Sequence, residues 1–250
     1  MTGARVAGSP ALKDAYRQVT DRVAEAAVRA HRKPEDVLVV AVTKTASPDQ
    51  IRNLVEMGHV DLGENRVQQL IQRVAQLEEF LSRKRTLSHD TPHDVRWHMI
   101  GHLQRNKVKQ VLPLVKLIHS VDSLRLAEEL QVLAARQDMT VDILLEVNVS
   151  GETSKTGIAP PAVPHLAEQI DTMIHLRLRG LMCMAPFTDK PEDTRPVFAR
   201  THELFHEIRG EHIGGETFNI LSMGMSNDFE IAIEEGANVV RIGRALFGEG

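Results

Sequence analysis

Cysteine, aromatic side chains and long apolar runs are all scarce in this chain of 250 residues. The single cysteine, Cys183, excludes an intrachain disulfide framework and a metal site built from several thiolates, and it fits a reducing compartment. No run approaches the roughly 18 apolar residues that span a bilayer, and the first residues lack the apolar stretch of a secretory signal. We therefore expect a cytoplasmic protein without a membrane segment.

Neither sign of charge is in large excess, because 30 lysines and arginines face 34 aspartates and glutamates, for a formal net charge of -4. This balance gives no electrostatic reason to expect nucleic acid or an anionic membrane as a partner. The hydrophobic fraction of 42% and the charged fraction of 26% are ordinary for a soluble globular protein. A chain of this length buries about three quarters of its unfolded surface.

Short apolar runs alternate with stretches of helical character along the chain. An amphipathic helix is predicted from Leu12 to about Ala30, before any strand. Eight strand-like runs follow, each with a longer helical stretch after it, and their almost continuous apolarity is typical of parallel strands buried on both faces. The runs are residues 37–43, 60–63, 96–101, 114–121, 141–149, 176–184, 217–224 and 238–243.

This alternation favours a single (β/α)₈ barrel domain over residues 1–250, since such barrels are typically about 250 residues long. A doubly wound open sheet is the alternative fold. No linker or break in composition divides the chain. The polar segment 81–94 is predicted to be a surface loop between the second helix and the third strand.

The first candidate functional residue is a lysine at the end of a buried strand, Lys44 in "VLVVAVTK". In a (β/α)₈ barrel the carboxyl ends of the strands form the working face. A solvated loop lysine is the ordinary alternative. A lysine directly after a buried strand is, however, expected to be partly desolvated, which favours the neutral, nucleophilic amine that a Schiff base requires.

Two segments near the C-terminus have the composition of an anion site. Ser222, Gly224 and Ser226 lead into a helix predicted to begin at Ser226 or Asn227, and the free N–H groups of a helix start bind anions. Simple helix capping is the alternative for these residues. Gly243 ends the eighth strand and allows close approach of a ligand to the backbone.

The loops after strands 7 and 8 commonly bind phosphate in this fold. Barrel closure makes strand 8 the neighbour of strand 1, so Lys44 is expected beside these loops. An imine-forming lysine beside a phosphate site implies a phosphorylated aldehyde or ketone, and pyridoxal 5′-phosphate (PLP) is the most economical candidate.

Arg241 lies two residues before Gly243 and could either form a surface ion pair, the ordinary role of such a residue, or face the cofactor. If Arg241 faces the ring nitrogen of the cofactor, that nitrogen stays neutral, because a guanidinium has no acceptor and keeps its proton. A neutral pyridine is a poorer electron sink than a pyridinium, so such a site binds the cofactor but drives carbanion chemistry weakly.

The other strand ends are less specific. Asn65 follows the second strand and could simply cap the next helix instead of contacting a ligand. His98 lies within the third strand, where a histidine is more often a buried core residue than a catalyst. Met182 and Met184 are predicted to pack in the barrel. The loop at 148–157 is predicted to be a solvated loop or a lid.

Together these motifs resemble the pyridoxal phosphate homeostasis protein family, the YggS type. The matching stretches are "VAVTKTAS", "LGENRVQ", "WHMIGHLQRNK", "EVNVSGETSKTG", "GLMCMAP" and "LSMGMSNDFEIAIEEGANVVRIGRALFG", which extend from residue 40 to 248. The resemblance implies a single-domain barrel like the N-terminal domain of alanine racemase, a fold type III PLP protein. It also implies a monomer that holds PLP and delivers it to PLP-dependent apoenzymes, with no established turnover.

The resemblance further implies roles for individual residues. Where family members often have threonine after "RIG", this chain has Arg244, so a backbone contact to phosphate is expected there without a hydroxyl contact. The implied cofactor site consists of Lys44 as the Schiff-base lysine, Ser226, Gly243 and the Arg244 backbone at the phosphate, Ser222 and Gly224 shaping that loop, Arg241 at the pyridine nitrogen, and Asn65 and His98 near the cofactor.

Two enzymes on the same scaffold are the alternatives. Racemases of this fold pair the lysine with a tyrosine from a second domain, for which 250 residues leave no room, and the only tyrosine, Tyr16, lies on the first helix. A Schiff-base aldolase needs a carboxylate or second lysine near Lys44 as acid/base, and Glu64 is the only obvious strand-end candidate. We therefore predict a non-catalytic PLP carrier.

Overall fold

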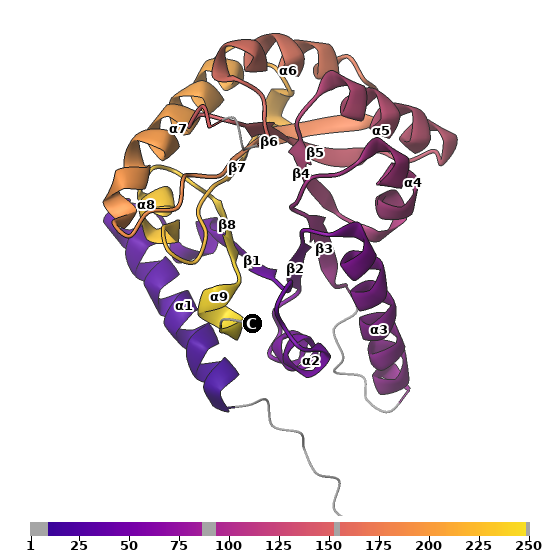
Figure 1. Cartoon of the computed structure of the whole chain (residues 1–250), viewed down its shortest axis with the longest axis vertical. Coiled ribbons are helices and arrows are strands. Elements are labelled where there is room, and N and C mark those ends of the chain that lie inside the picture. The colour runs from indigo at the N-terminus through magenta and orange to yellow at the C-terminus, as the bar shows by residue number, and fades with distance from the viewer. Residues whose placement is uncertain (1–9, 87–93, 153–155, 249–250) are drawn as a thin grey trace, which may run out of the picture.

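The computed structural model describes residues 10–86, 94–152 and 156–248. Eight parallel strands close into a barrel in sequence order, with helices around the outside (Figure 1). The ring closes where β1 pairs with β8, from Leu38 opposite Val239 to Ala41 opposite Ile242. The predicted barrel is therefore confirmed, and the open sheet is excluded. The strands are β1 Leu38–Val42, β2 Asp61–Glu64, β3 Arg96–Met99, β4 Leu117–Val121, β5 Val141–Val147, β6 Leu176–Cys183, β7 Ile220–Ser222 and β8 Val239–Ile242.

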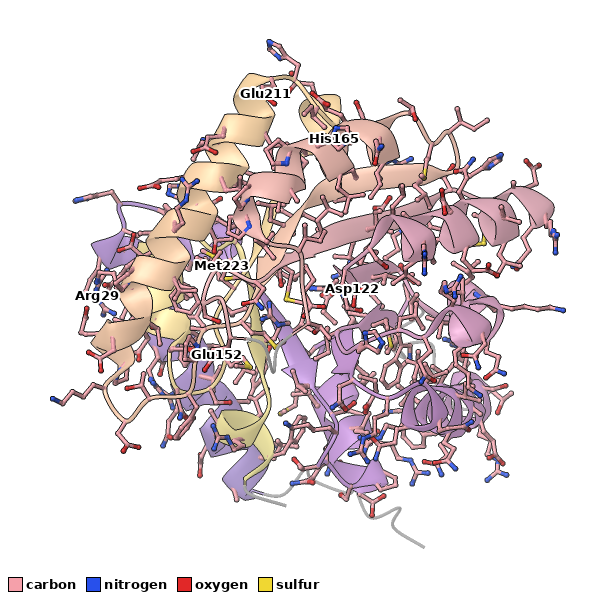
Figure 2. The ribbon with its side chains drawn as sticks, turned by 45° about the horizontal axis from the view of Figure 1, so that its top comes forward. Arg29, Asp122, Glu152, His165, Glu211 and Met223 are labelled. Carbon is pink, nitrogen blue, oxygen red and sulfur yellow. The ribbon has the colours of Figure 1, made fainter. Side chains whose placement is uncertain are left out.

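The α-helices pack their apolar faces on the outside of the barrel, and this layer holds most of the buried core. Polar side chains on these helices point outward, as His165 on α6 and Glu211 after α7 do, whereas Met223 lies inside the fold (Figure 2). Among the residues described, no helix is long and apolar enough to cross a bilayer. The helices are α1 Pro10–Arg29, α2 Pro48–Glu56, α3 Val67–Arg85, α4 Val108–Val111, α5 Leu124–Arg136, α6 Val163–Asp171, α7 Arg195–Gly210, α8 Phe229–Glu234 and α9 Arg244–Phe247.

The extra helix α1 lies beside the last elements of the chain. It contacts α8 and α9, as the indigo and yellow ribbons show in Figure 1. Arg22 forms an ion pair with Glu230 of α8 at 2.7 Å, and Arg29 forms one with Glu234 at the same distance. The first and last segments therefore support one another at the β8–β1 junction.

Two local predictions were wrong. The segment 81–94 is not a loop throughout, because α3 continues to Arg85. Buried Leu81 and an ion pair between Arg83 and Glu79 one turn earlier favour helix there, and residues 87–93 lie outside the described part. Helix α8 begins at Phe229, later than expected, because residues 226–228 form a turn instead.

Candidate functional site

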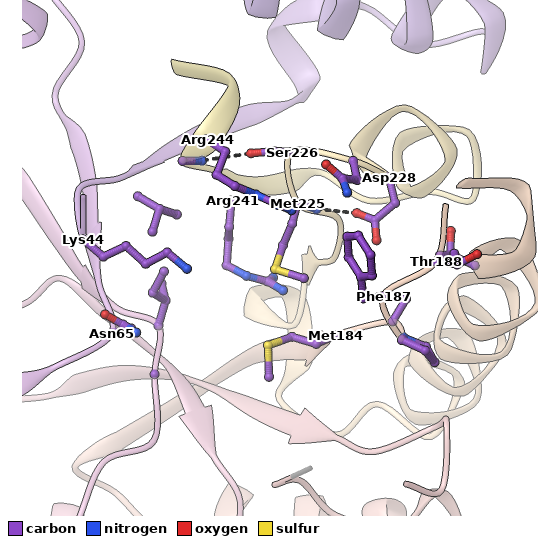
Figure 3. A pocket seen from close by; sticks show the side chains of 18 of the residues that line it. Lys44, Asn65, Met184, Phe187, Thr188, Met225, Ser226, Asp228, Arg241 and Arg244 are labelled. Atoms are coloured by element: carbon purple, nitrogen blue, oxygen red, sulfur yellow. Dashed lines mark hydrogen bonds between the residues drawn. The ribbon is translucent and has the colours of Figure 1, made fainter. Parts of the chain in front are cut away.

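A cavity of about 620 Å³ opens at the carboxyl ends of the strands (Figure 3). Its volume falls within the range of small-molecule sites, roughly 300–1,000 Å³. One wall comes from β1, β8 and the loop after β7, and the opposite wall comes from β3, β5 and β6. Predicted residues in the lining are Lys44, Asn65, Ser226, Arg241, Gly243 and Arg244.

Lys44 follows β1 in a turn, and its side chain extends into the cavity in Figure 3. Arg73 of α3 donates hydrogen bonds to the carbonyl of Thr43 and, at 3.3 Å, to that of Lys44. Helix α2 starts immediately after the turn with a capping box, in which Ser47 and Gln50 bond each other's backbone N–H. The prediction of partial desolvation was wrong: Thr43 is the last buried residue before the cavity, and Lys44 is exposed.

Glu64 lies beneath this turn rather than in the cavity lining. Its side chain is fully buried, 3.0 Å from Arg73 Nε, and it accepts a hydrogen bond from the Thr43 hydroxyl. Burial raises the pKa of Glu64, although Thr43 and Arg73 act in the opposite direction. The carboxylate therefore supports the backbone at Lys44, and it does not face a ligand as an aldolase acid would.

The two C-terminal segments meet as predicted. Ser226 Oγ accepts hydrogen bonds from the backbone N–H groups of Gly243 and Ala245, both at 3.3 Å (Figure 3). These N–H groups belong to the start of α9, a four-residue helix that lines the cavity at Arg244. Ala245 was not predicted, because its amide is placed by the helical turn and not by its side chain.

Gly224 shapes the loop that carries Ser226. Its φ of +87° is in the left-handed region, and an added Cβ would lie 2.6 Å from the Ala232 side chain and 2.8 Å from Phe229 Cα. Its carbonyl accepts a hydrogen bond from the Arg241 backbone at 3.0 Å. The predicted role of Gly224 is thus structural, because close packing on α8 requires a glycine.

Arg241 is buried at the floor of the cavity, with 3% of its surface exposed. Its guanidinium donates to Ser222 Oγ at 2.6 Å and to the Cys183 carbonyl at 2.8 Å. Burial lowers the pKa of Arg241 from its ordinary value. The alternative of a surface ion pair is therefore excluded. Ser222 is itself fully buried and lies outside the cavity lining, so it meets the site only through Arg241.

His98 is buried inside the barrel and does not line the cavity. Its Nε2 lies 3.1 Å from Asp61 Oδ1, and its Nδ1 lies 3.0 Å from His119 Nε2. His119 in turn contacts Ser222 Oγ through Nδ1, at 3.0 Å. The structure thus places His98 behind the predicted site. Asp61 and His119 were not predicted, although each is a polar residue within an apolar run.

Asn65 follows β2 and lines the cavity. Its side-chain Oδ1 is buried and has no hydrogen-bond partner among the described residues. The capping alternative is excluded, because the N-cap of α3 is Arg66. An added Cβ at Gly101 would lie 2.3 Å from the Asn65 carbonyl, so the segment that follows β3 fixes Asn65 by close backbone packing.

The opposite wall of the cavity contains groups that the sequence did not single out. Glu146 at the end of β5 is 2% exposed and accepts a 2.6 Å hydrogen bond from Thr156 Oγ1. Burial raises the pKa of Glu146. Met182 packs in a small apolar cluster inside the barrel, as predicted. Met184 was predicted to pack there too; it contacts that cluster and also lines this side of the cavity. In the described part of the chain, no group of three or more potential ligands could hold a metal ion.

Comparison with known proteins gives a consistent result. The model of the alanine racemase N-terminal domain family matches residues 10–250. The pyridoxal phosphate homeostasis protein of Aquifex aeolicus (strain VF5) is 39% identical over 232 residues, which make up 93% of this chain and 95% of that protein.

Solved structures show the same similarity. An unknown protein from Bifidobacterium adolescentis is 34% identical, with a TM-score of 0.85 over 99% of this chain and 98% of that chain. PipY of Synechococcus elongatus PCC7942, solved with PLP bound, is 31% identical, with a TM-score of 0.76 over 92% of this chain and 100% of that chain. The chain therefore belongs to the family of pyridoxal phosphate homeostasis proteins, built on the alanine racemase N-terminal barrel.

Proposed function

We propose that this protein holds PLP as a Schiff base on Lys44 and takes part in intracellular PLP homeostasis by buffering and delivering the cofactor. The observation that carries this proposal is the shared cavity: Lys44, Arg241 and the start of α9 at Gly243 and Arg244 all line it. PLP supplies an aldehyde that condenses with an amine, a pyridine ring and a phosphate. PLP is also the ligand named for the related PipY structure.

The residues present fit each part of PLP. The N–H groups of Gly243 and Ala245, now bonded to Ser226 Oγ, are donors of the kind that hold a phosphate. Val42 and Ile100 provide apolar surface for a ring. The orphaned amide oxygen of Asn65 needs a donor, as expected of a residue that faces a polar ligand.

Arg241 supports holding rather than turnover. The guanidinium is a donor only and stays protonated, so beside the ring nitrogen it disfavours a pyridinium. The cofactor then withdraws electrons weakly from a bound amine. Arg241 is buried and fixed by two hydrogen bonds. It therefore cannot rotate away to let an acidic side chain take its proposed place beside the ring nitrogen.

The position of Tyr16 also favours a carrier over a racemase. Its hydroxyl lies 3.4 Å from His59 Nδ1, and it is not among the described residues that line the cavity. The proposed carrier is a cytoplasmic monomer of a single domain, and PLP-dependent apoenzymes are its proposed recipients.

The proposal is tested by trapping the lysine adduct. Protein saturated with PLP is reduced with borohydride and digested, and the peptides are analysed by mass spectrometry. We expect a pyridoxyl group on Lys44 and loss of the visible absorbance in Lys44→Ala. Lys109→Ala, which removes an exposed lysine from α4, is the control and should keep the absorbance. An unmodified Lys44 in the saturated protein would overturn the proposal.

The racemase alternative is tested separately by α-proton exchange of amino acids in heavy water. We expect exchange no faster than with free PLP. Faster exchange that disappears in Lys44→Ala would show that the protein is an enzyme.

A further inference from the structure

A continuous chain of polar side chains crosses the interior of the barrel. Arg241 Nη1 donates to Ser222 Oγ at 2.6 Å, and this oxygen lies 3.0 Å from His119 Nδ1. His119 Nε2 lies 3.0 Å from His98 Nδ1, and His98 Nε2 lies 3.1 Å from Asp61 Oδ1. The two imidazoles meet edge to face, with their centroids 5.2 Å apart. Five neighbouring groups from β2, β3, β4, β7 and β8 are thus joined.

The chain connects the two ends of the barrel. At the amino end of β3, Arg96 holds Asp61 through both carboxylate oxygens, at 2.8 and 2.5 Å, and its side chain is 41% exposed. At the other end, Arg241 lines the cavity. The carboxylate of Asp61 is stabilised as an anion: burial raises its pKa, but the hydrogen bonds and electrostatic attraction from His98 and Arg96 together outweigh burial and lower it to about 2.

One arrangement of protons satisfies every link with neutral imidazoles. A guanidinium only donates, so Ser222 Oγ accepts from Arg241 and its own hydrogen is available for His119 Nδ1. His119 then carries its proton on Nε2 and donates to His98 Nδ1. His98 carries its proton on Nε2 and donates to the Asp61 carboxylate. Burial keeps His119 neutral, because its pKa is lowered well below the ordinary value.

Hydrogen bonds donated in the opposite direction, from His98 toward Ser222, leave a mismatch at the Asp61 end of the chain. If His119 donated from Nδ1 to Ser222, His98 would donate from Nδ1 to His119. The Nε2 of a neutral His98 would then face Asp61 without a hydrogen, so two acceptors would lie 3.1 Å apart. With both imidazoles neutral, the carboxylate therefore sets the direction of the whole chain.

We propose that Ser222, His119, His98 and Asp61 form a relay, the hydrogen-bonded chain described above, that positions the guanidinium of Arg241 for the cofactor. The relay consists of positioning residues, since only Arg241 reaches the cavity. The inference rests on the proposed function for the identity of the cofactor. The relay also gives His98 a role within the barrel: its hydrogen bond to Asp61 fixes its tautomer, and this fixes the direction of the hydrogen bonds that reach Arg241 at the cavity floor.

The proton arrangement is tested first, in the full chain without PLP. Long-range ¹H–¹⁵N NMR of the imidazoles distinguishes the two neutral tautomers. We expect His98 and His119 both to carry the proton on Nε2. In Ser222→Ala, His119 Nδ1 should lose its donor, and its ¹⁵N shift should change. A proton on His119 Nδ1, or an unchanged shift in the variant, would overturn the relay whether or not PLP binds.

The positioning role is tested in the PLP-loaded protein. Ser222→Ala should shift the visible absorption band and weaken PLP binding roughly tenfold, the factor expected for one hydrogen bond to a charged group. Ser222→Thr keeps the hydroxyl and should restore the wild-type band. The matched control is Ser120→Ala, which removes another buried serine hydroxyl, one that donates to the Gly101 carbonyl at 2.6 Å and lies outside the relay.

The outcomes separate the two proposals. If wild-type protein forms no adduct on Lys44, the proposed function fails, while the NMR result still decides the relay. If the adduct forms but the bands and affinities of Ser222→Ala and Ser120→Ala agree, the positioning role is wrong and the proposed function stands. Circular dichroism and thermal unfolding of each variant identify any that fail to fold. In that case His119→Gln takes the place of Ser222→Ala in the same comparison.

Discussion

At the scale of single residues, Lys44 is positioned through its backbone carbonyl. Arg73 bonds that carbonyl and the preceding one, and it also pairs with the buried Glu64 carboxylate. Arg73 of α3 therefore fixes the backbone of Lys44, although Lys44 itself follows β1.

Arg73→Ala should lower the free energy of unfolding by about 3 kcal/mol, because it leaves a buried carboxylate without its counter-ion. Denaturant unfolding measures the change. Adding Glu64→Gln to Arg73→Ala should recover part of the loss. Arg52→Ala, which removes a more exposed pair with Asp49, should change stability by less than about 1 kcal/mol. Equal effects of Arg73→Ala and Arg52→Ala would contradict the expectation.

Asp61 makes stability depend on pH in the acid range. Its pKa is 3.8 ordinarily and about 2 in the fold, so its contribution is present above pH 3.8 and is lost as the pH falls toward 2. The shift corresponds to about 2 kcal/mol. Asp61→Asn should therefore be less stable than wild type at pH 6, and the difference should shrink by about this amount near pH 2. Urea unfolding at both pH values tests this, and a constant difference would refute it.

At the scale of elements, residues 223–228, the loop of the proposed phosphate site, depend on close contact between backbone and helix. Gly224 packs against Phe229 and Ala232 of α8, and the same loop bonds the backbone of β8. The loop, α8 and β8 therefore form one packed unit.

Gly224→Ala should lower the free energy of unfolding by about 2 kcal/mol or more, because a Cβ at this φ is strained and also overlaps α8. PLP affinity should fall as well, since the loop carries Ser226. Gly58→Ala is an informative control: its φ is +94°, but no atom lies within 4 Å of the added Cβ. If both variants lose the same stability, strain alone explains the loss and the contact with α8 contributes nothing.

The elements themselves could largely be predicted from the sequence, because buried parallel strands produce unbroken apolar runs. The end of α3 at Arg85 and the start of α8 at Phe229 could not, since polar residues suit a helix end as well as a loop. The lining residues Lys44 and Gly243 could be found because strand ends share one face of a barrel. The relay could not, because it depends on the register of five strands that are distant in sequence.

At the scale of the whole molecule, pairing around the barrel is uneven. β5 pairs with β6 from Val141 to Val147, whereas the register between β7 and β8 is limited to Ser222 opposite Val239 within the described chain. The β7–β8 ladder is thus short, although backbone hydrogen bonds from Met223 to Val239 and from Arg241 to Gly224 continue it into the loop of the proposed phosphate site.

Hydrogen exchange should reflect this difference. Amides of β5 and β6 should exchange most slowly, close to the global unfolding rate, and those of β7 should exchange faster through local opening. PLP should slow exchange in β7 and α9 more than in β5. Exchange measured by mass spectrometry with and without PLP tests both points, and uniform protection around the barrel would contradict them.

The hydroxyl of Ser226 affects how tightly the proposed site binds a phosphate group. Because this hydroxyl already accepts hydrogen bonds from Gly243 and Ala245, a phosphate that binds at the proposed site would exchange one acceptor for another. The gain is only the difference between a neutral bond, about 1 kcal/mol, and a charge-assisted one, about 1.5–3 kcal/mol. On departure the hydroxyl returns to the same amides, so no donor is left bare. Ser226 Oγ thus replaces the phosphate as the acceptor of these two amides, so release of a phosphorylated ligand has a small free-energy cost at this site.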